Sequence, residues 1–267
     1  MGAENFRNKK NYNEEYKLSE KRITSLINNT NIVNETQKIF PEETTVLLAT
    51  TNFMRRITKV ANKTLPFFDK QPSLRAVMEL FCRNRELAHF SVVCMLNAGY
   101  SETKILSRVA FENLSLMRLL AIRPEVASTW FSDPDKFRRQ WTAKKIRKAV
   151  FSKIPEQLAG YDNFYWLLCD YTHPSFKGWF EIFKRQKNSV SIGDRPEFNS
   201  EYASECVGLI GFIVLQSVEV YSRFFQKWLD ENILKEANTL KLNVLDIVRR
   251  HFEIREYDKK GLLRGQL

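Results

Sequence analysis

Residues 207–215, VGLIGFIVL, form the longest uninterrupted apolar stretch of the chain. Acidic residues, Glu205 and Glu219, lie close on either side. A helix that crosses a membrane needs roughly 20 apolar residues, and this stretch has nine. It therefore predicts a helix buried in the core of a globular protein. With no apolar signal segment at the N-terminus either, we expect a cytoplasmic protein that makes no use of a membrane.

The composition of the whole chain agrees with a helical fold. Its 267 residues are 43% hydrophobic, with only 9 Gly and 8 Pro, which argues against collagen-like, disordered and turn-rich β proteins. Apolar residues recur with helical spacing nearly everywhere. The sequence predicts an all-α fold, an irregular bundle of about eight helices, with at most a short hairpin near residues 188–198.

The predicted organisation is a loose N-terminal tail over residues 1–13, a single helical domain over 14–253 and a basic C-terminal tail over 254–267. Proline and acidic residues mark helix starts at Pro41 and Pro134, and Gly99 suits the left-handed position that ends a helix. The expected helices cover about residues 14–28, 41–62, 73–99, 101–124, 133–153, 155–171, 200–230 and 231–253.

The cysteines and histidines do not predict a metal site. None of the four cysteines forms a CxxC pair, and each lies in an apolar helical context. This pattern is typical of small buried thiols in a reducing compartment. The three histidines show no metal-ligand spacing such as HExxH. We expect no metal and no cofactor.

Residues 83–89, RNRELAH, are the first candidate site. A histidine of near-neutral pKa can exchange protons, and an arginine can stabilise charge that develops on a phosphate. The spacing of Arg83 and His89, with Asn84 after the arginine, resembles the signature of HEPN-type ribonucleases. The resemblance implies that Arg83 and His89 act on an RNA phosphodiester without a metal, that Asn84 orients the site, and that the site forms across a homodimer.

A purely structural role for the same residues stays open. On a helix, His89 falls on the side of the apolar residues Met78 and Val93, and Arg83 lies about 120° away. In that case His89 is a core histidine with satisfied hydrogen bonds and Arg83 is a solvated residue.

The second candidate is residues 106–112, LSRVAFE, in a segment that is apolar over most of its helical circumference. Arg108, Glu112 and Ser115, with Lys104, form one narrow polar stripe. Such a helix is expected at the centre of the bundle. If the stripe faces outward, Arg108 and Glu112 form a surface pair. If it faces inward, the pair lines a site or fixes the packing.

The third candidate is His173, at the end of residues 165–173, YWLLCDYTH. This segment and the Arg-x-x-x-Glu step of Arg108 and Glu112 resemble a bacterial all-helical family of unknown function over roughly residues 75–180. The resemblance implies a helical fold and carries no activity. His173 either stabilises a helix C-terminus through the helix dipole or joins Arg108 and Glu112 in a pocket.

The fourth candidate is a basic segment at residues 136–153. The chain has a net charge of +11, and this segment holds eight Lys and Arg residues and no acidic residue. Lysine and arginine neutralise phosphates, and aromatic rings stack on unpaired bases. The candidate nucleic-acid-binding residues are Arg138, Arg139, Trp141, Lys144, Lys145, Arg147 and Lys148, with Phe137 and Phe151 as further aromatic neighbours. The alternative is an ordinary solvated surface helix.

Together these features favour an RNA-binding helical protein, with metal-independent endoribonuclease activity of the toxin or antiviral-defence type as the more specific hypothesis. RNA or another polyanion and a second copy of the chain are the expected partners. Two alternatives stay open: a non-catalytic scaffold or regulator that binds an acidic partner, and a sensor of a small molecule or nucleotide whose polar pocket holds Arg108, Glu112 and His173.

Overall fold

The structure is a computed structural model that describes residues 30–64, 71–152, 155–172, 183–186, 189–192 and 197–251. These residues form ten helices and one two-stranded hairpin, which confirms the predicted all-α fold. The elements are α2 (Thr30–Ile39), α3 (Pro41–Thr64), α4 (Pro72–Leu96), α5 (Tyr100–Ile122), α6 (Val126–Ser132), α7 (Pro134–Gln140), α8 (Ala143–Val150), α9 (Pro155–Thr172), β1 (Phe183–Gln186), β2 (Ser189–Ile192), α11 (Ser200–Phe224) and α12 (Glu231–His251).

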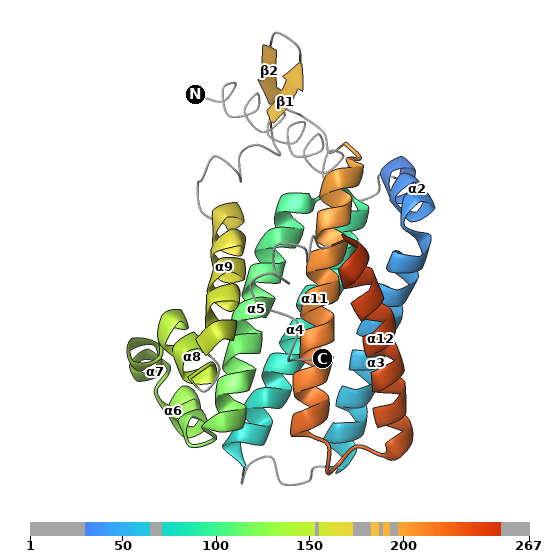
Figure 1. Ribbon diagram of the computed structural model, residues 1–267. Helices are drawn as coiled ribbons and strands as arrows, with labels where there is room; N and C mark the ends of the chain where they lie inside the picture. Colours follow the sequence, from blue (N-terminus) through green and yellow to red (C-terminus); the bar gives the residue numbers. More distant parts are fainter. Residues whose placement is uncertain are drawn as a thin grey trace, which may run out of the picture.

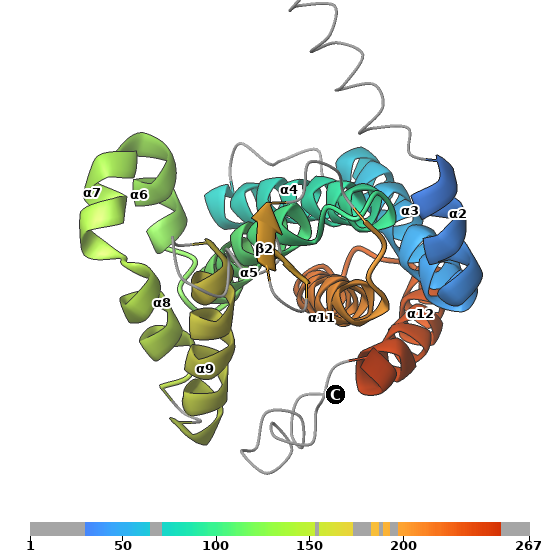
Figure 2. The same ribbon diagram turned by 90° about the horizontal axis from the view of Figure 1, so that it is seen from above.

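Three long helices, α4, α5 and α11, form the centre of the bundle (Figure 1). Helices α3 and α12 cover α11 and α4 on one side, and α8 and α9 pack against α5 on the other. Seen from above, α6, α7 and α8 lie at one end of the molecule, far from α2 and α12 (Figure 2). The arrangement places the basic segment at the edge of the bundle.

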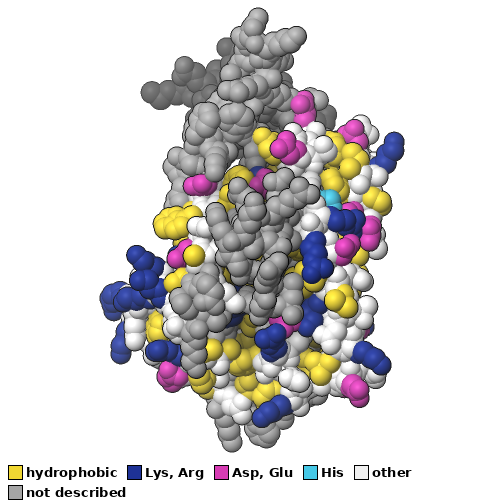
Figure 3. Space-filling view, viewed as in Figure 1, with side chains coloured by type: hydrophobic (Ala, Val, Ile, Leu, Met, Phe, Trp, Pro, Cys, Tyr) yellow, Lys and Arg dark blue, Asp and Glu magenta, His cyan; other side chains and the backbone are white. Residues whose placement is uncertain are grey.

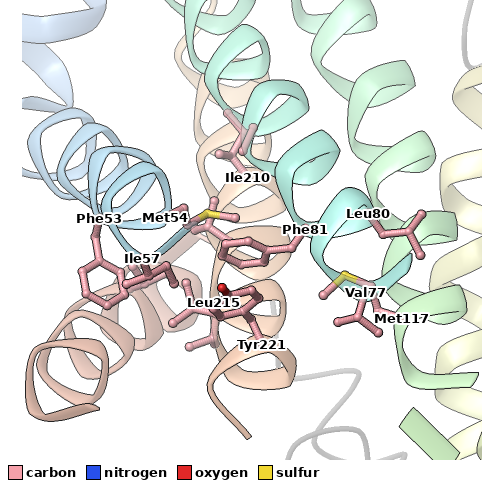
Figure 4. Packing of buried hydrophobic residues seen from close by; sticks show 14 of the residues in the cluster. Phe53, Met54, Ile57, Val77, Leu80, Phe81, Met117, Ile210, Leu215 and Tyr221 are labelled. Carbon is pink, nitrogen blue, oxygen red and sulfur yellow. The ribbon is translucent and has the colours of Figure 1, made fainter. Parts of the chain in front are cut away.

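The main core cluster joins α3, α4, α5, α11 and α12 around two stacked rings. Phe81 of α4 and Tyr221 of α11 lie with their ring centroids 4.0 Å apart, and Met54 and Ile57 of α3 pack nearby (Figure 4). The Tyr221 hydroxyl donates to the Met78 sulfur at 3.5 Å. Burial raises the pKa of Tyr221 well above its usual value, so this phenol stays neutral at any physiological pH.

Helix α11 contains the apolar stretch at residues 207–215, and that stretch is buried, as predicted, except for the half-buried Phe212. In the part of the chain that the structure describes, α11 is the one helix long and apolar enough to cross a membrane, but 72% of its apolar window is buried inside the protein. It packs closely on α12, because a Cβ atom at Gly211 would lie 3.0 Å from Val248 Cγ2. Helix α11 is therefore the core helix that the sequence predicts.

The turn between α4 and α5 differs from the prediction in one residue. Ala98, not Gly99, has the left-handed backbone, with φ of 58°, whereas Gly99 has φ of −82°. A Cβ atom at Gly99 would lie only 3.2 Å from both Cys94 O and Glu102 Oε2. Glycine at this position therefore allows the close approach of two helix ends, while the alanine before it makes the turn.

The segment predicted as one helix over residues 133–153 is two short helices, α7 and α8, and an unpredicted helix, α6, precedes them. Asp133 caps α7 by accepting from Lys136 N, as its position before Pro134 suggests. The helix is interrupted between Gln140 and Ala143, because the Thr142 hydroxyl accepts from Lys145 N and caps the start of α8. The change of direction buries both Phe137 and Ile146. We call residues 126–150, the three short helices, the basic lobe.

A hairpin is present, but its strands are residues 183–186 and 189–192, so it begins earlier in the sequence than the predicted range of 188–198. Residues 189–192 form β2 and pair antiparallel with β1, in a register that places Phe183 opposite Ile192 and Gln186 opposite Ser189. Helix α11 ends at Phe224 and not near residue 230, and Asp230 accepts from Ile233 N at the start of α12. The expected helix at 14–28 and both predicted tails lie outside the described residues.

Candidate functional site

Arg83 and His89 both lie on the exposed side of α4. This corrects the alternative in which His89 is a core histidine, because its ring is at the surface, edge-on to the ring of Phe90 with the two centroids 6.2 Å apart. Two apolar neighbours are exposed as well, Phe90 at 55% and Val93 at 39%. Six residues of helix separate Arg83 and His89 by about 9 Å along the axis. Within one chain they therefore face solvent separately and do not converge on one atom.

Asn84 is on the opposite side of the same helix and is fully buried. Its amide nitrogen donates to Ala110 O and to Ser217 Oγ, each at 3.1 Å, and its carbonyl accepts from Asn113 Nδ2 at 2.9 Å. This network connects α4, α5 and α11. Asn84 does not reach the surface that carries Arg83 and His89, so its polar groups hold the three central helices together.

Lys104 is the most deeply buried charge in the described part of the chain, with an exposed fraction of 0%. Its ammonium group lies 2.7 Å from Glu205 Oε2 of α11 and 3.9 Å from the ring centroid of Tyr171 of α9. The Tyr171 hydroxyl donates to the other oxygen of Glu205 at 2.6 Å. A buried charge is tolerated only when it is paired in this way, so the cluster fastens α5, α9 and α11 together.

Arg108 and Glu112 are paired, with Nε and Oε1 3.3 Å apart, at the edge of the same interface. The Arg108 guanidinium lies 5.8 Å from the ring centroid of Tyr165 on α9. Burial alone lowers the pKa of Arg108, but the neighbouring Cys169, Tyr165 and Glu112 raise it above its usual value. Arg108 therefore stays charged. His173, the third predicted member, lies outside the described residues.

The polar stripe of α5 faces the neighbouring helix α9. Of the two orientations left open by the sequence, the stripe therefore has the inward one, in which it contributes to helix packing. Along the stripe, Lys104 meets Tyr171, Arg108 meets Tyr165, and Ser115 Oγ lies 3.0 Å from Tyr161 Oη. We call these three pairs the polar ladder. The spacing of polar residues on α5 indicates this stripe in the sequence, whereas its tyrosine partners on α9 become evident only from the packing of the two helices.

Six cations of the basic lobe are exposed: Lys136, Arg138, Arg139, Lys144, Lys145 and Lys148. Figure 3 shows lysine and arginine side chains gathered on the side of the molecule where α7 and α8 lie. Arg138 pairs with Asp135 at 2.7 Å. The other five form no ion pair with any residue that the structure describes. The lobe therefore presents positive charge that the protein itself does not neutralise.

Arg147, another of the predicted nucleic-acid-binding residues, is an exception. Its side chain is 4% exposed, and its Nε lies 2.6 Å from Asp162 Oδ1 of α9. The guanidinium also lies 3.8 Å from the ring centroid of Tyr165. Arg147 is thus a buried anchor that holds α8 on α9, and it is not available to a phosphate.

The aromatic residues of the segment are mostly unavailable for stacking on bases. Phe137 and Phe151 are buried in the core. Trp141 is half-buried, and the Arg123 guanidinium lies 5.6 Å from its ring centroid. Residues 136–153 therefore expose little aromatic surface, whereas Phe131 of α6, in the same lobe, is 36% exposed and has the Arg75 guanidinium 5.0 Å from its ring centroid.

The structure brings no metal-binding group of side chains together among the residues it describes. The four cysteines are free thiols, two buried and two half-buried, and burial raises the pKa of Cys82 and of Cys94. His251, the third histidine, donates from Nε2 to Glu43 Oε1 and shares a hydrogen bond between Nδ1 and Ser204 Oγ, each at 2.9 Å. These groups serve packing.

Comparisons of the chain with protein-family models, with curated proteins and with solved structures found no match.

Proposed function

We propose that this protein binds RNA through the basic lobe. The observation that carries the proposal is the set of exposed cations on α7 and α8, of which five have no carboxylate partner in the described structure. Each phosphate that a lysine or arginine neutralises releases counterions, which makes binding favourable and dependent on salt. The lobe holds these cations together at one end of the bundle.

The position of the cations supports a phosphate-backbone contact. Lys144, Lys145 and Lys148 point into solvent from α8, whereas Ile146 and Arg147 of the same helix are buried. The buried side fixes the helix to the bundle, and the exposed side is left for a ligand. Lysine and arginine contacts with phosphates carry no sequence information, so the proposal is binding with little sequence preference.

The test is RNA binding by the full chain at several salt concentrations. Replacing Lys144, Lys145 and Lys148 together by Gln is expected to weaken binding of a single-stranded RNA about tenfold or more and to reduce the salt slope by about 2, since each phosphate contact contributes about 0.7. The matched control replaces the exposed lysines Lys38, Lys59 and Lys235 by Gln, which lowers the net charge equally. Equal loss in both variants contradicts the proposal, because net charge alone then explains binding.

A second candidate function is RNA cleavage at a surface that two copies complete. The observation that favours it is the exposure of Arg83 and His89 on α4 beside the exposed apolar residues Phe90 and Val93. Apolar side chains of this size at the surface are typical of protein interfaces. An antiparallel contact between two α4 helices brings Arg83 of one copy towards His89 of the other.

Cleavage assays separate this function from binding. His89→Ala and Arg83→Ala are each expected to abolish RNA cleavage, with or without a chelator, and to leave RNA affinity nearly unchanged. Glu79→Ala, on the exposed side of the same helix, is the control. Phe90→Asp is expected to abolish cleavage by preventing dimer formation, which sedimentation measures directly. Wild-type activity in the His89→Ala variant ends the hypothesis.

A further inference from the structure

One aromatic side chain of the basic lobe is exposed, and it is Phe131 of α6. The lobe holds four aromatic residues, all of which the structure describes. Phe137 is buried, and Trp130 and Trp141 are half-buried. Phe131 is 36% exposed, and its helix packs against α7 at the end of the bundle (Figures 1 and 2). An apolar ring is therefore at the surface of the same lobe that carries the exposed cations.

Two neighbours hold the Phe131 ring in place. The Arg75 guanidinium of α4 lies 5.0 Å from its ring centroid, and Arg75 Nε is itself paired with Glu79 Oε1 at 2.8 Å. The Trp130 ring centroid lies 4.9 Å from that of Phe131, with 51° between the ring planes, so the two rings are tilted and not stacked. A ring fixed in this way loses little conformational freedom when another flat group packs on its exposed surface.

The residues that follow Phe131 in the sequence are polar and charged. The Asp133 carboxylate accepts from Lys136 N at the start of α7, and Asp135 is paired with Arg138. Both acidic side chains are thus bonded to groups of α7, whereas the Lys136 side chain is exposed and forms no ion pair with the described residues. One ring in polar surroundings is too small for a protein interface, which buries a larger apolar patch. Its size does match the face of a single nucleobase.

We propose that Phe131 stacks on an unpaired base of the RNA, so that the partner of the basic lobe is single-stranded RNA. The inference rests on the RNA binding proposed above and names the kind of RNA. The faces of bases within a duplex are covered by their neighbours in the stack, so an aromatic side chain reaches such a face only where the strand is unpaired. The exposed cations of the lobe contact the phosphates, and Phe131 contacts the base.

The affinities of the full chain for a single-stranded oligouridylate and for an RNA duplex of the same length test the inference. Phe131→Leu keeps an apolar side chain but removes the aromatic face. It is expected to weaken binding of the single strand about fivefold or more and to leave the affinity for the duplex unchanged. The salt slope is expected to stay the same, because stacking neutralises no phosphate. Phe131→Tyr keeps the ring and is expected to bind both RNAs like the wild-type chain.

Leu242→Ala is the control for the loss of an exposed apolar side chain, because Leu242 is 68% exposed on α12, far from the lobe (Figure 2). It is expected to leave both affinities unchanged. Three results overturn the inference while RNA binding by the lobe stands: unchanged affinity of Phe131→Leu for the single strand, an equal loss for the duplex, or an equal loss in Phe131→Tyr. If the wild-type chain binds neither RNA, the proposed function is wrong and the inference is wrong with it.

Discussion

Arg147 and Lys148 are consecutive residues of α8, yet their surroundings are opposite. Arg147 is 4% exposed, lies against the ring of Tyr165 and pairs with Asp162. Lys148 is exposed and forms no ion pair with the described residues. Arg147 continues the chemistry of the polar ladder, in which buried cations meet a ring and a carboxylate. Lys148 belongs to the exposed surface of the basic lobe.

The difference shows that the function of a cation is decided by its partners. In the polar ladder, Lys104 and Arg108 are satisfied by groups of the protein, so these cations stabilise the fold. In the basic lobe, the cations keep their hydration and their charge, so they are available to an external anion. A count of positive residues along the sequence contains both kinds. Replacing a paired cation is expected to lower the free energy of unfolding, whereas replacing an exposed cation is expected to weaken RNA binding.

The largest effect is expected at Lys104. Lys104→Ala leaves the Glu205 carboxylate, which is partly solvated, without its cation and also removes the cation from the Tyr171 ring, so the expected loss of unfolding free energy is about 3 kcal/mol, at the low end for a buried pair. The free energy of unfolding in urea measures this. Lys144→Ala, the control from the basic lobe, is expected to change it by less than about 0.5 kcal/mol. If the two variants are equally stable, Lys104 is not a structural cation and the comparison fails.

A smaller loss of stability is expected for Arg147, and its neighbour Lys148 is expected to affect RNA binding instead. Arg147→Ala is expected to lower the free energy of unfolding by about 2 kcal/mol, since Asp162 loses its partner but is still partly solvated. Lys148→Ala is expected to leave stability unchanged and to reduce the salt slope of RNA binding by about 0.7. The comparison is wrong if Lys148→Ala destabilises the protein or if Arg147→Ala reduces the salt slope as much.

The smallest change in stability is expected at Glu43, a carboxylate on the far side of the bundle that bonds to two side chains of α12. Glu43 of α3 accepts from Arg250 Nη1 at 2.9 Å and lies 2.9 Å from His251 Nε2. Burial alone raises the pKa of Glu43, but the hydrogen bond with His251 and the charges of His251 and Arg250 outweigh it and lower the pKa below 4.5. A carboxyl whose pKa is lowered on folding stabilises the protein above its ordinary pKa.

The stabilisation by Glu43 is therefore lost as the pH falls from 4.5 towards the lower pKa of the folded state. The difference in unfolding free energy between the wild-type chain and Glu43→Gln is expected to be constant above about pH 5.5 and to shrink below pH 4.5. Glu35→Gln, at an exposed position, is the control. A difference that grows on acidification refutes the assignment.

Much of the fold could be predicted because its signals are local. The start of α3 at Pro41 and the end of α5 before Pro124 follow from the geometry of proline. The burial of residues 207–215 follows from their composition alone. The break at Thr142 was not predicted, because a threonine hydroxyl caps a helix only where the chain turns, and the turn depends on burying Phe137 and Ile146.

The candidate sites were less predictable because they depend on contacts between distant residues. Asn84 is buried by partners on α5 and α11 that lie 26 and 133 residues away in sequence. His89 was placed on the apolar side of α4, but no neighbouring helix covers that part of its surface, and it is exposed.

The contact between Arg147 and Asp162 has a further consequence for binding at the basic lobe. Because α8 cannot leave α9 without breaking the pair of Arg147 with Asp162 and the contact of its guanidinium with the Tyr165 ring, the backbone beneath Lys144, Lys145 and Lys148 is already ordered before a ligand arrives. Only side-chain rotamers then lose freedom on association, which costs about 0.5–1.5 kcal/mol for each immobilised side chain. A disordered basic tail with the same three lysines would also lose backbone entropy on binding. The entropic cost of the proposed phosphate contact is therefore lower for α8 than for such a tail.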